Sequence, residues 1–135
     1  MAARIEHPTL YTDGSAGPSL LAARCAACGR VSFPRQNFGC EACGAHGEAM
    51  ADVEIAARGA LISFAVVRKH MGADIEAPFA IGEIRLEAGP VIRCTLADGL
   101  EETALRAGAK VTGLLAHNPK SSADVLELRF APEGR

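Results

Sequence analysis

Two short stretches, CAACG at residues 25–29 and CEACG at residues 40–44, decide how the N-terminal part of the chain folds. Each contains a Cys-x-x-Cys pair followed directly by glycine, and eleven residues separate the two pairs. Such turns can bring four thiolates around one tetrahedral Zn²⁺, and glycine suits them because it has no Cβ to clash. Four protein ligands leave no open position on the metal, so the zinc would be structural. We expect one zinc ion, bound by Cys25, Cys28, Cys40 and Cys43.

Two disulfides are the alternative for four cysteines, and they are typical of secreted proteins. The first residues, MAARIEHP, contain no apolar stretch of the kind found in signal peptides. We therefore expect a cytoplasmic protein with reduced cysteines. His46 follows Cys43 by three residues and could replace a cysteine ligand. With four well-spaced cysteines present, we expect His46 to be exposed instead.

The composition limits the classes of function. Hydrophobic residues make up 49% of the 135 residues and aromatic residues only 4%, so the core must be aliphatic. The net charge of −2 argues against a general polyanion binder. No apolar run approaches the roughly 20 residues of a membrane helix, so we expect no membrane span.

Residues 23–50 read as a zinc ribbon. Between the two cysteine pairs, Val31 and Phe33 alternate with polar neighbours as in a short strand. Pro34 then ends that strand, because proline cannot donate to a ladder. Two metal-binding turns joined by a short hairpin would form the ribbon.

Residues 1–22 read as an extended arm, because they are rich in proline and glycine. We expect the arm to end in a short helical turn at residues 19–23. Tyr11, the only tyrosine, either anchors the arm on another surface or lies in a loosely packed tail.

Residues 51–135 carry five apolar segments with strand-like composition. A short helical stretch at residues 98–107 separates the third segment from the fourth. Three strands, a helical link and two strands is the order of an OB barrel, and a sandwich of short strands is the alternative. In the last strand we expect Leu126, Leu128 and Phe130 to face inward and Glu127 and Arg129 outward. The predicted strands are 61–67, 79–86, 91–96, 111–116 and 124–130.

Cys94, the fifth cysteine, lies in the third of these strands. It shares one face of a period-2 pattern with Ile92 and Leu96, which indicates a small core residue. A nucleophilic role is the alternative, but no histidine lies near Cys94 in the sequence.

Four motifs in this order give the chain a resemblance to a known family: LxxRCxxCGxxxFPR at residues 21–35, RGxLxSFxVV at 58–67, PFxIGxIxLxxG at 78–89 and LRxGxKV at 105–111. The chain resembles the proteins with a rubredoxin-like zinc ribbon followed by an OB-fold, catalogued as domain of unknown function thirty-five. The resemblance covers nearly the whole chain. The short Gly/Pro-rich arm departs from the helices that many members carry there.

The resemblance implies a non-catalytic accessory subunit of a thiolase-like acyl-CoA enzyme, with the chemistry on a partner chain and two copies of each chain in the complex. Other members of the family pair with hot-dog-fold hydratases. The ribbon and the arm would lie against the catalytic partner. The candidate interface residues are Tyr11, Phe33, Pro34 and Arg35, although Phe33 could pack within the ribbon instead.

The resemblance also implies that the OB barrel holds part of a coenzyme A thioester. Arg68, Lys69 and His70 follow the first barrel strand and could meet the phosphates of coenzyme A. Lys120 lies in the loop before the last strand, which borders many OB ligand sites. The alternative for all four residues is an ordinary solvated loop.

Two other classes of function remain open. OB barrels and zinc ribbons both occur in single-stranded nucleic-acid-binding proteins, but such sites need stacking aromatics and a basic groove. This chain has no tryptophan, a single tyrosine outside the barrel and a net negative charge. A free-standing acyl-CoA-binding module, soluble and monodisperse without a partner, is the other alternative.

Overall fold

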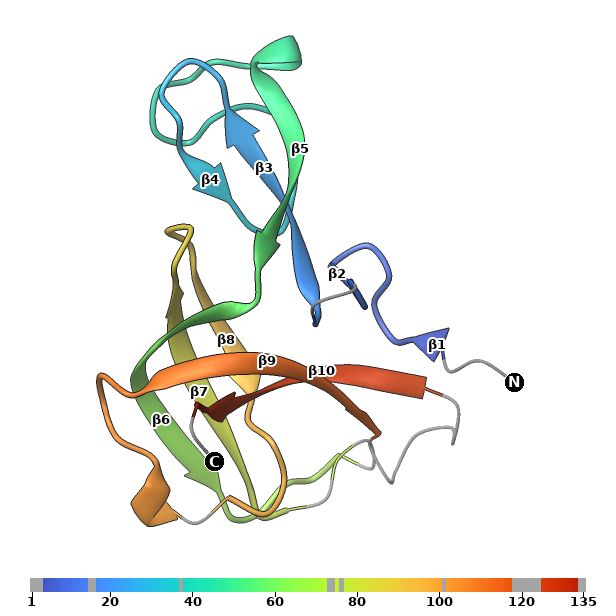
Figure 1. Cartoon of the computed structure of the whole chain (residues 1–135), viewed down its shortest axis with the longest axis vertical. Coiled ribbons are helices and arrows are strands. Elements are labelled where there is room, and N and C mark those ends of the chain that lie inside the picture. The colour runs from blue at the N-terminus through green and yellow to red at the C-terminus, as the bar shows by residue number, and fades with distance from the viewer. Residues whose placement is uncertain are drawn as a thin grey trace.

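Strands make up almost all of the structure, a computed structural model that describes residues 4–14, 17–36, 38–72, 75, 77–100, 102–117 and 125–133. The chain forms two units, a small ribbon and a larger curled sheet below it (Figure 1). None of the helical segments within these ranges has the length and apolar character that a membrane crossing needs.

The ribbon is an antiparallel sheet with β3 (Ser19–Cys25) at its centre. On one side, β5 (Met50–Ala56) pairs with β3 along its whole length. On the other side lie two short strands, β2 (Tyr11–Thr12) and β4 (Val31–Ser32). A single 3-10 turn, η1 (Gly47–Ala49), leads into β5. The short strand predicted between the cysteine pairs is present as β4.

The helical turn predicted at residues 19–23 is wrong, because these residues belong to β3. Leu20 and Ala22 are fully buried while Ser19 and Leu21 are only half-buried, and this alternation is that of a strand. The predicted segment boundaries at 22/23 and 50/51 accordingly fall inside β3 and β5, two strands that pair with each other.

The curled sheet below the ribbon contains the five predicted barrel strands. Its strand order is β1-β10-β9-β6-β7-β8. A parallel bridge between Leu96, just after β8, and Phe130 of β10 brings the two ends of this order together, which confirms the predicted OB barrel. The predicted helical link is only a single 3-10 turn, η2 (Glu102–Ala104). The barrel strands are β6 (Arg58–Val67), β7 (Phe79–Leu86), β8 (Val91–Thr95), β9 (Lys110–His117) and β10 (Val125–Pro132).

One hydrophobic core joins the ribbon to the barrel. Leu20 and Ile55, from the paired ribbon strands, belong to the same buried cluster as Leu61 and Phe130 of the barrel. A second, small cluster under the metal-binding turns holds Ala23, Cys25, Cys40 and Met50. The lower half of the ribbon is therefore held by apolar packing, whereas its tip has very little apolar packing of its own.

The outer side of β10 is covered by the N-terminal arm. The first arm strand, β1 (Arg4–Ile5), pairs in parallel with β10. The prediction that Arg129 faces solvent is wrong, because the residue is only 8% exposed. Its guanidinium donates hydrogen bonds to the carboxylate of Glu127 and to the carbonyl of Leu128, both at 3.1 Å. Leu128 and Phe130 are buried as predicted, and Leu126 is half-buried.

Tyr11 fastens the arm to the chain's own core. The residue is 4% exposed and belongs to the main buried cluster, and the ring of His7 lies edge-on to it at 6.2 Å. The alternative of a loosely packed tail is therefore wrong. Tyr11 was also a candidate contact for a partner protein, but its burial leaves almost no ring surface for one.

Gly59 marks a point where no side chain fits. It pairs with Leu86 of β7 and with Val111 of β9, and a Cβ built on it would overlap the backbone carbonyl of Arg85. We predict that Gly59→Ala lowers the free energy of unfolding by about 1–3 kcal/mol, as overpacking does. Gly108→Ala is the control, because its Cβ meets open space and only its φ of 89° is unfavourable, a cost of about 1 kcal/mol. Urea unfolding measures both variants, and an equal loss of unfolding free energy in the two would contradict the steric explanation.

Burial raises the pKa of Tyr11 above its ordinary value of 10.0, against the lowering effect of its hydrogen bond to the Leu128 backbone. The folded chain thus favours the neutral phenol, a contribution to stability that is complete below pH 10 and is lost as pH rises through the folded-state pKa. The chain has one tyrosine and no tryptophan, so phenolate absorbance reports this residue cleanly. We predict a higher titration midpoint in the native chain than in denaturant, and equal midpoints would show that the ring is not buried.

Candidate metal centre and binding surfaces

The four ribbon cysteines converge at the tip of the ribbon. Their Sγ atoms all lie within 4.8 Å of one another. The Sγ atoms of Cys25 and Cys43 are 3.6 Å apart, and those of Cys28 and Cys40 are 3.5 Å apart. With Zn–S bonds of about 2.3 Å, a tetrahedral site needs sulfur atoms about 3.8 Å apart. The four cysteines therefore fit a structural zinc ion.

The same turn is built twice around this cluster. The N–H of Gly29 donates to the carbonyl of Cys25 at 2.7 Å, and the N–H of Gly44 donates to the carbonyl of Cys40 at 2.9 Å. Both glycines have φ near +80°, at 82° and 81°, a conformation that side chains with a Cβ disfavour. This requirement explains why glycine directly follows each cysteine pair.

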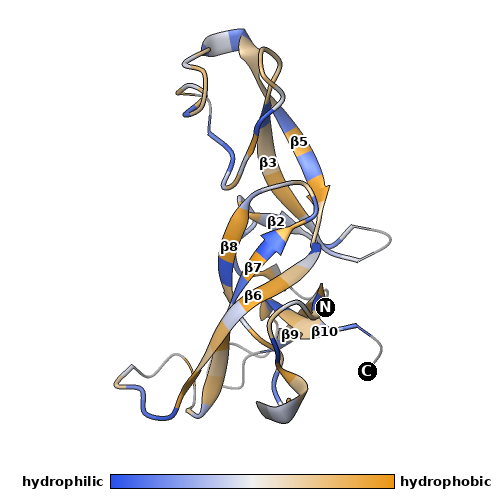
Figure 2. Ribbon diagram, turned by 90° about the vertical axis from the view of Figure 1, so that its left-hand side faces the viewer, coloured by the Kyte–Doolittle hydropathy of each residue, from blue (hydrophilic) through white to orange (hydrophobic). Residues whose placement is uncertain are grey.

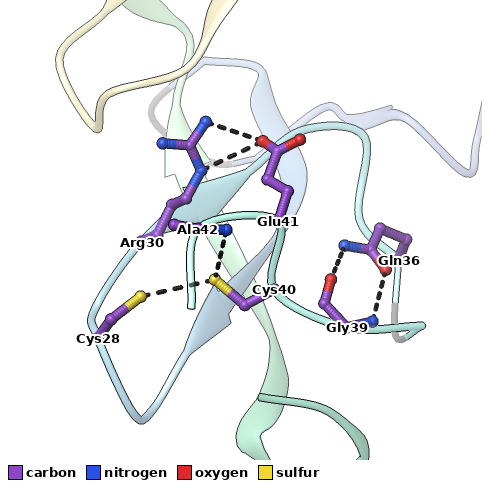
Figure 3. A network of polar contacts seen from close by, with 7 residues as sticks. All are labelled: Cys28, Arg30, Gln36, Gly39, Cys40, Glu41 and Ala42. Carbon is purple, nitrogen blue, oxygen red and sulfur yellow. Dashed lines mark hydrogen bonds and ion pairs between the residues drawn. The ribbon is translucent and has the colours of Figure 1, made fainter. Parts of the chain in front are cut away.

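Backbone amides point at the sulfur of Cys40. The N–H groups of Cys43 and Ala42 lower the pKa of the Cys40 thiol to about 6, and the Ala42 nitrogen lies 3.4 Å from its Sγ (Figure 3). The Cys28 thiol keeps its proton more firmly. Although the backbone of Arg30 lowers its pKa, hydrogen bonding to the neighbouring Cys40 sulfur raises it to about 11. The sulfurs of Cys28 and Cys40 thus share a proton unequally. A bound metal ion would displace that proton and hold all four sulfurs as thiolates.

An ion pair joins the two turns on the surface. The guanidinium of Arg30, which follows the first pair, lies 2.8 Å from the carboxylate of Glu41 in the second pair (Figure 3). Both side chains are at least half exposed, so this contact adds little stability. His46 is exposed as predicted and does not join the cysteine cluster.

The predicted interface residues in the ribbon hairpin differ in exposure. Phe33 is half-buried and packs against the main core, while Pro34 and Arg35 are exposed. The guanidinium of Arg35 lies 3.5 Å from the carboxylate of Asp52 on β5. Of this motif, only Pro34 and Arg35 offer substantial surface.

The strongest apolar feature of the ribbon is Phe38, which the sequence analysis did not select. Its side chain is 91% exposed. The side-chain amide of Gln36 donates to the carbonyl of Gly39 at 2.7 Å (Figure 3). Its oxygen accepts the N–H of Phe38 at 2.7 Å. The signal was present in the sequence as an apolar ring next to a glycine, in a polar loop between two metal-binding turns.

Of the candidate coenzyme A residues, Arg68, Lys69 and His70 lie in the described part of the chain. Arg68 borders a cavity of about 220 Å³ at one end of the barrel, with Phe79, Leu96 and Asp98 among the other lining residues. Lys69 and His70 are exposed, and the His70 ring lies edge-on to Phe79 at 5.4 Å. Lys120 lies outside the described residues.

Cys94 is a core residue, as predicted. Its thiol donates to the carbonyl of Leu128 at 3.5 Å, and burial raises its pKa to about 11. At neutral pH the group is a protonated thiol, which is a poor nucleophile.

We predict one zinc ion per chain and its loss in Cys40→Ser, because a tetrahedral thiolate site with three sulfurs binds zinc less tightly and the ribbon tip folds with its metal. Cys94→Ala is the control and should keep a full equivalent. Elemental analysis of purified protein measures both. Less than about half an equivalent in the unaltered chain would contradict a four-thiolate site.

Several solved structures resemble this chain, and two of them illustrate the likeness. The Ltp2-ChsH2(DUF35) aldolase matches with a TM-score of 0.61 and 24% identity, over 81% of this chain and 84% of that chain. A protein of unknown function from the DUF35 family of Sulfolobus solfataricus matches with a TM-score of 0.48 and 18% identity, over 82% of this chain and 75% of that chain. None of the curated protein sequences matches. The first likeness supports the two-unit fold.

Two family models match consecutive parts of the chain. The rubredoxin-like zinc ribbon domain of ChsH2 matches residues 17–48, and the C-terminal OB-fold domain of ChsH2 matches residues 52–114. Together they span most of the sequence, in the order in which the structure places ribbon and barrel. The chain therefore belongs to the ChsH2 (DUF35) family, in which a rubredoxin-like zinc ribbon precedes an OB-fold domain.

Proposed function

We propose that this protein is a non-catalytic accessory subunit of a thiolase-like acyl-CoA enzyme and that it docks on the catalytic subunit through its ribbon. Family membership supports the proposal, since a solved structure with this fold is the Ltp2-ChsH2(DUF35) aldolase. The reacting groups would belong to the catalytic subunit. This chain would contribute docking surface and help to position a coenzyme A thioester, and positioning accelerates a step without a reacting side chain.

The single observation that carries the docking proposal is the exposure of Phe38. An aromatic ring that is 91% exposed loses contact with water when a partner covers it, and buried aromatic anchors dominate the energetics of many interfaces. Gln36 bonds to the backbone of Phe38 and Gly39. Hydrogen bonds that hold these two residues before binding reduce the conformational entropy lost on docking.

The zinc ion would be held by Cys25, Cys28, Cys40 and Cys43 and would act as a structural cross-link. It would connect the two turns that flank the Phe38 loop, so that metal binding and presentation of the ring are coupled. Thiolate ligands require reduced cysteines, which favours a reducing compartment such as the cytoplasm.

The barrel end around Arg68 is the proposed contact for the coenzyme A thioester. The adjoining cavity of about 220 Å³ is smaller than a typical ligand site of about 300–1,000 Å³. It would accept only one part of the ligand, with the rest lying on the catalytic subunit. Arg68 supplies a cationic group of the kind that binds phosphate. Lys69 and His70, which follow it directly, and Lys120, in the loop before the last strand, are the further candidates.

The aromatic residues of the barrel support nucleic-acid binding less well than the accessory function. Phe130 is fully buried, and Phe64 and Phe79 are half-buried. Base stacking needs exposed aromatic faces along a basic groove, and the exposed ring of this chain lies on the ribbon instead.

We predict that Phe38→Ala weakens binding to the catalytic subunit about tenfold or more, as loss of an aromatic anchor does. The measurement begins with recovery of a thiolase-like subunit that co-elutes in a fixed ratio with the tagged chain from its native cells. Titration calorimetry of the recombinant pair then compares variants. Met71→Ala is the matched control, because this side chain is 95% exposed but lies on the barrel.

Two results would overturn the docking proposal. One is the absence of any thiolase-like subunit in a fixed ratio with the chain. The other is a complex that tolerates Phe38→Ala but is weakened by Met71→Ala, which would place the interface at the barrel end.

A further inference from the structure

The ribbon has one long strand with an open edge. The seven-residue strand β5 pairs with β3 on one side, and no described strand pairs with its other side. Figure 2 likewise shows no strand beyond β5 on the side away from β3. Ala51, Asp52, Glu54 and Ala56 are all exposed, so this edge is accessible.

The hydrogen bonds of β3 reveal which groups lie on that edge. The N–H of Leu21 donates to Leu10 and its carbonyl accepts from Arg35, so both groups point away from β5. Leu21 stands opposite Glu54 in the antiparallel ladder, and in such a non-hydrogen-bonded pair the Glu54 backbone also points away from its neighbour. Asp52 lies opposite Ala23, two positions along the ladder. Because hydrogen-bonded and non-hydrogen-bonded pairs alternate, this pair is also of the non-hydrogen-bonded kind. The backbone groups of Asp52 and Glu54 therefore face outward.

Of the usual protections of an edge strand, β5 has charged side chains, those of Asp52 and Glu54. The described part of the chain gives it none of the others. Proline, bulges, short length and a covering segment normally block such edges. The register of β5 with β3 is continuous over seven residues, and its sequence, MADVEIA, contains no proline. The edge of the barrel strand β10, in contrast, has partners. β1 pairs with the first residues of β10, and Leu96 forms a bridge with Phe130 nearer its end.

The charges on β5 select what can pair with it. Asp52 and Glu54 are two residues apart, so their side chains lie on the same face of the sheet. Pairing with a second copy in antiparallel registers centred on residues 52 to 54 would set carboxylates directly opposite one another, which is destabilising. A strand with lysine or arginine at alternate positions would meet opposite charges instead. Arg35 is the cation near Asp52, and that pair is largely exposed.

We propose that the outer edge of β5 accepts an extended segment of the catalytic subunit that carries lysine or arginine at alternate positions. The added strand would bind through the outward N–H and carbonyl groups of Asp52 and Glu54, as in β-strand addition, while the two carboxylates select its charge. This inference rests on the proposed accessory function for the identity of the partner, but the edge itself can be tested separately.

The probe is a short synthetic peptide in which lysine alternates with valine. The control peptide has glutamate in place of each lysine. Amide hydrogen exchange of the zinc-loaded full chain is followed by NMR. The lysine peptide should slow exchange at Asp52 and Glu54, whose N–H groups face outward. It should leave Val53 and Ile55 unchanged, since these residues already bond to β3. Unchanged exchange at Asp52 and Glu54 would overturn the proposal. So would equal slowing of exchange at all four residues.

Two variants separate backbone pairing from charge. Glu54→Pro removes an outward N–H without touching a β3–β5 hydrogen bond, so zinc content should be unchanged while peptide binding is lost. The double variant Asp52→Lys, Glu54→Lys keeps every backbone donor and should prefer the glutamate peptide, with a change in relative affinity of about tenfold. Binding of the lysine peptide that survives Glu54→Pro in a zinc-loaded chain would overturn the proposal. So would a dimer of the unaltered chain that Glu54→Pro dissociates, because the occupant would then be a second copy.

The two proposals fail in different ways. A catalytic subunit that binds the Glu54→Pro chain as tightly as the unaltered chain, but not the Phe38→Ala chain, overturns strand addition and supports the accessory function. Failure to find any catalytic subunit overturns the accessory function, and the peptide experiment still decides whether β5 accepts a basic strand.

Discussion

The convergence of four thiols is the constraint on which the ribbon depends. The tip of the ribbon buries only a small cluster of Ala23, Cys25, Cys40 and Met50, and so little apolar burial cannot repay the entropy of ordering two long loops. A metal bound by all four sulfurs replaces the missing core with a cross-link. The Phe38 loop lies between the two cysteine pairs, so its shape depends on the same cross-link.

The second constraint is the sharing of β3 and β5 between the metal-binding tip and the barrel. At their upper ends these strands carry Cys25 and Met50, which pack under the metal-binding turns. At their lower ends Leu20 and Ile55 enter the barrel's core. The two units are thus extensions of one set of strands, joined by a shared hydrophobic core.

Much of the fold was predictable because its signals are local. The spacing of the cysteines, the glycines that follow them and the alternation in residues 79–86 depend only on near neighbours in sequence, and β7 has those bounds in the structure. The errors arose where distant segments meet. Residues 19–23 were predicted as a helical turn, but pairing with β5 makes them a strand. Arg129 was predicted to be exposed, but it is buried and its guanidinium bonds to Glu127 and to the Leu128 carbonyl. The candidate site followed the same rule, since the cysteine cluster was visible in the sequence whereas the exposure of Phe38 was not.

The sequence by itself determined the chemistry of the ribbon and the class of the barrel, because cysteine spacing and strand periodicity are properties of short segments. Only the tertiary structure decided which groups are available to a partner. Tyr11, Phe33 and Phe38 are all aromatic residues, yet packing buries the first, half-buries the second and leaves the third 91% exposed. The open edge of β5 likewise depends on which strands pair, and pairing across a sheet is set by long-range contacts that no local pattern encodes.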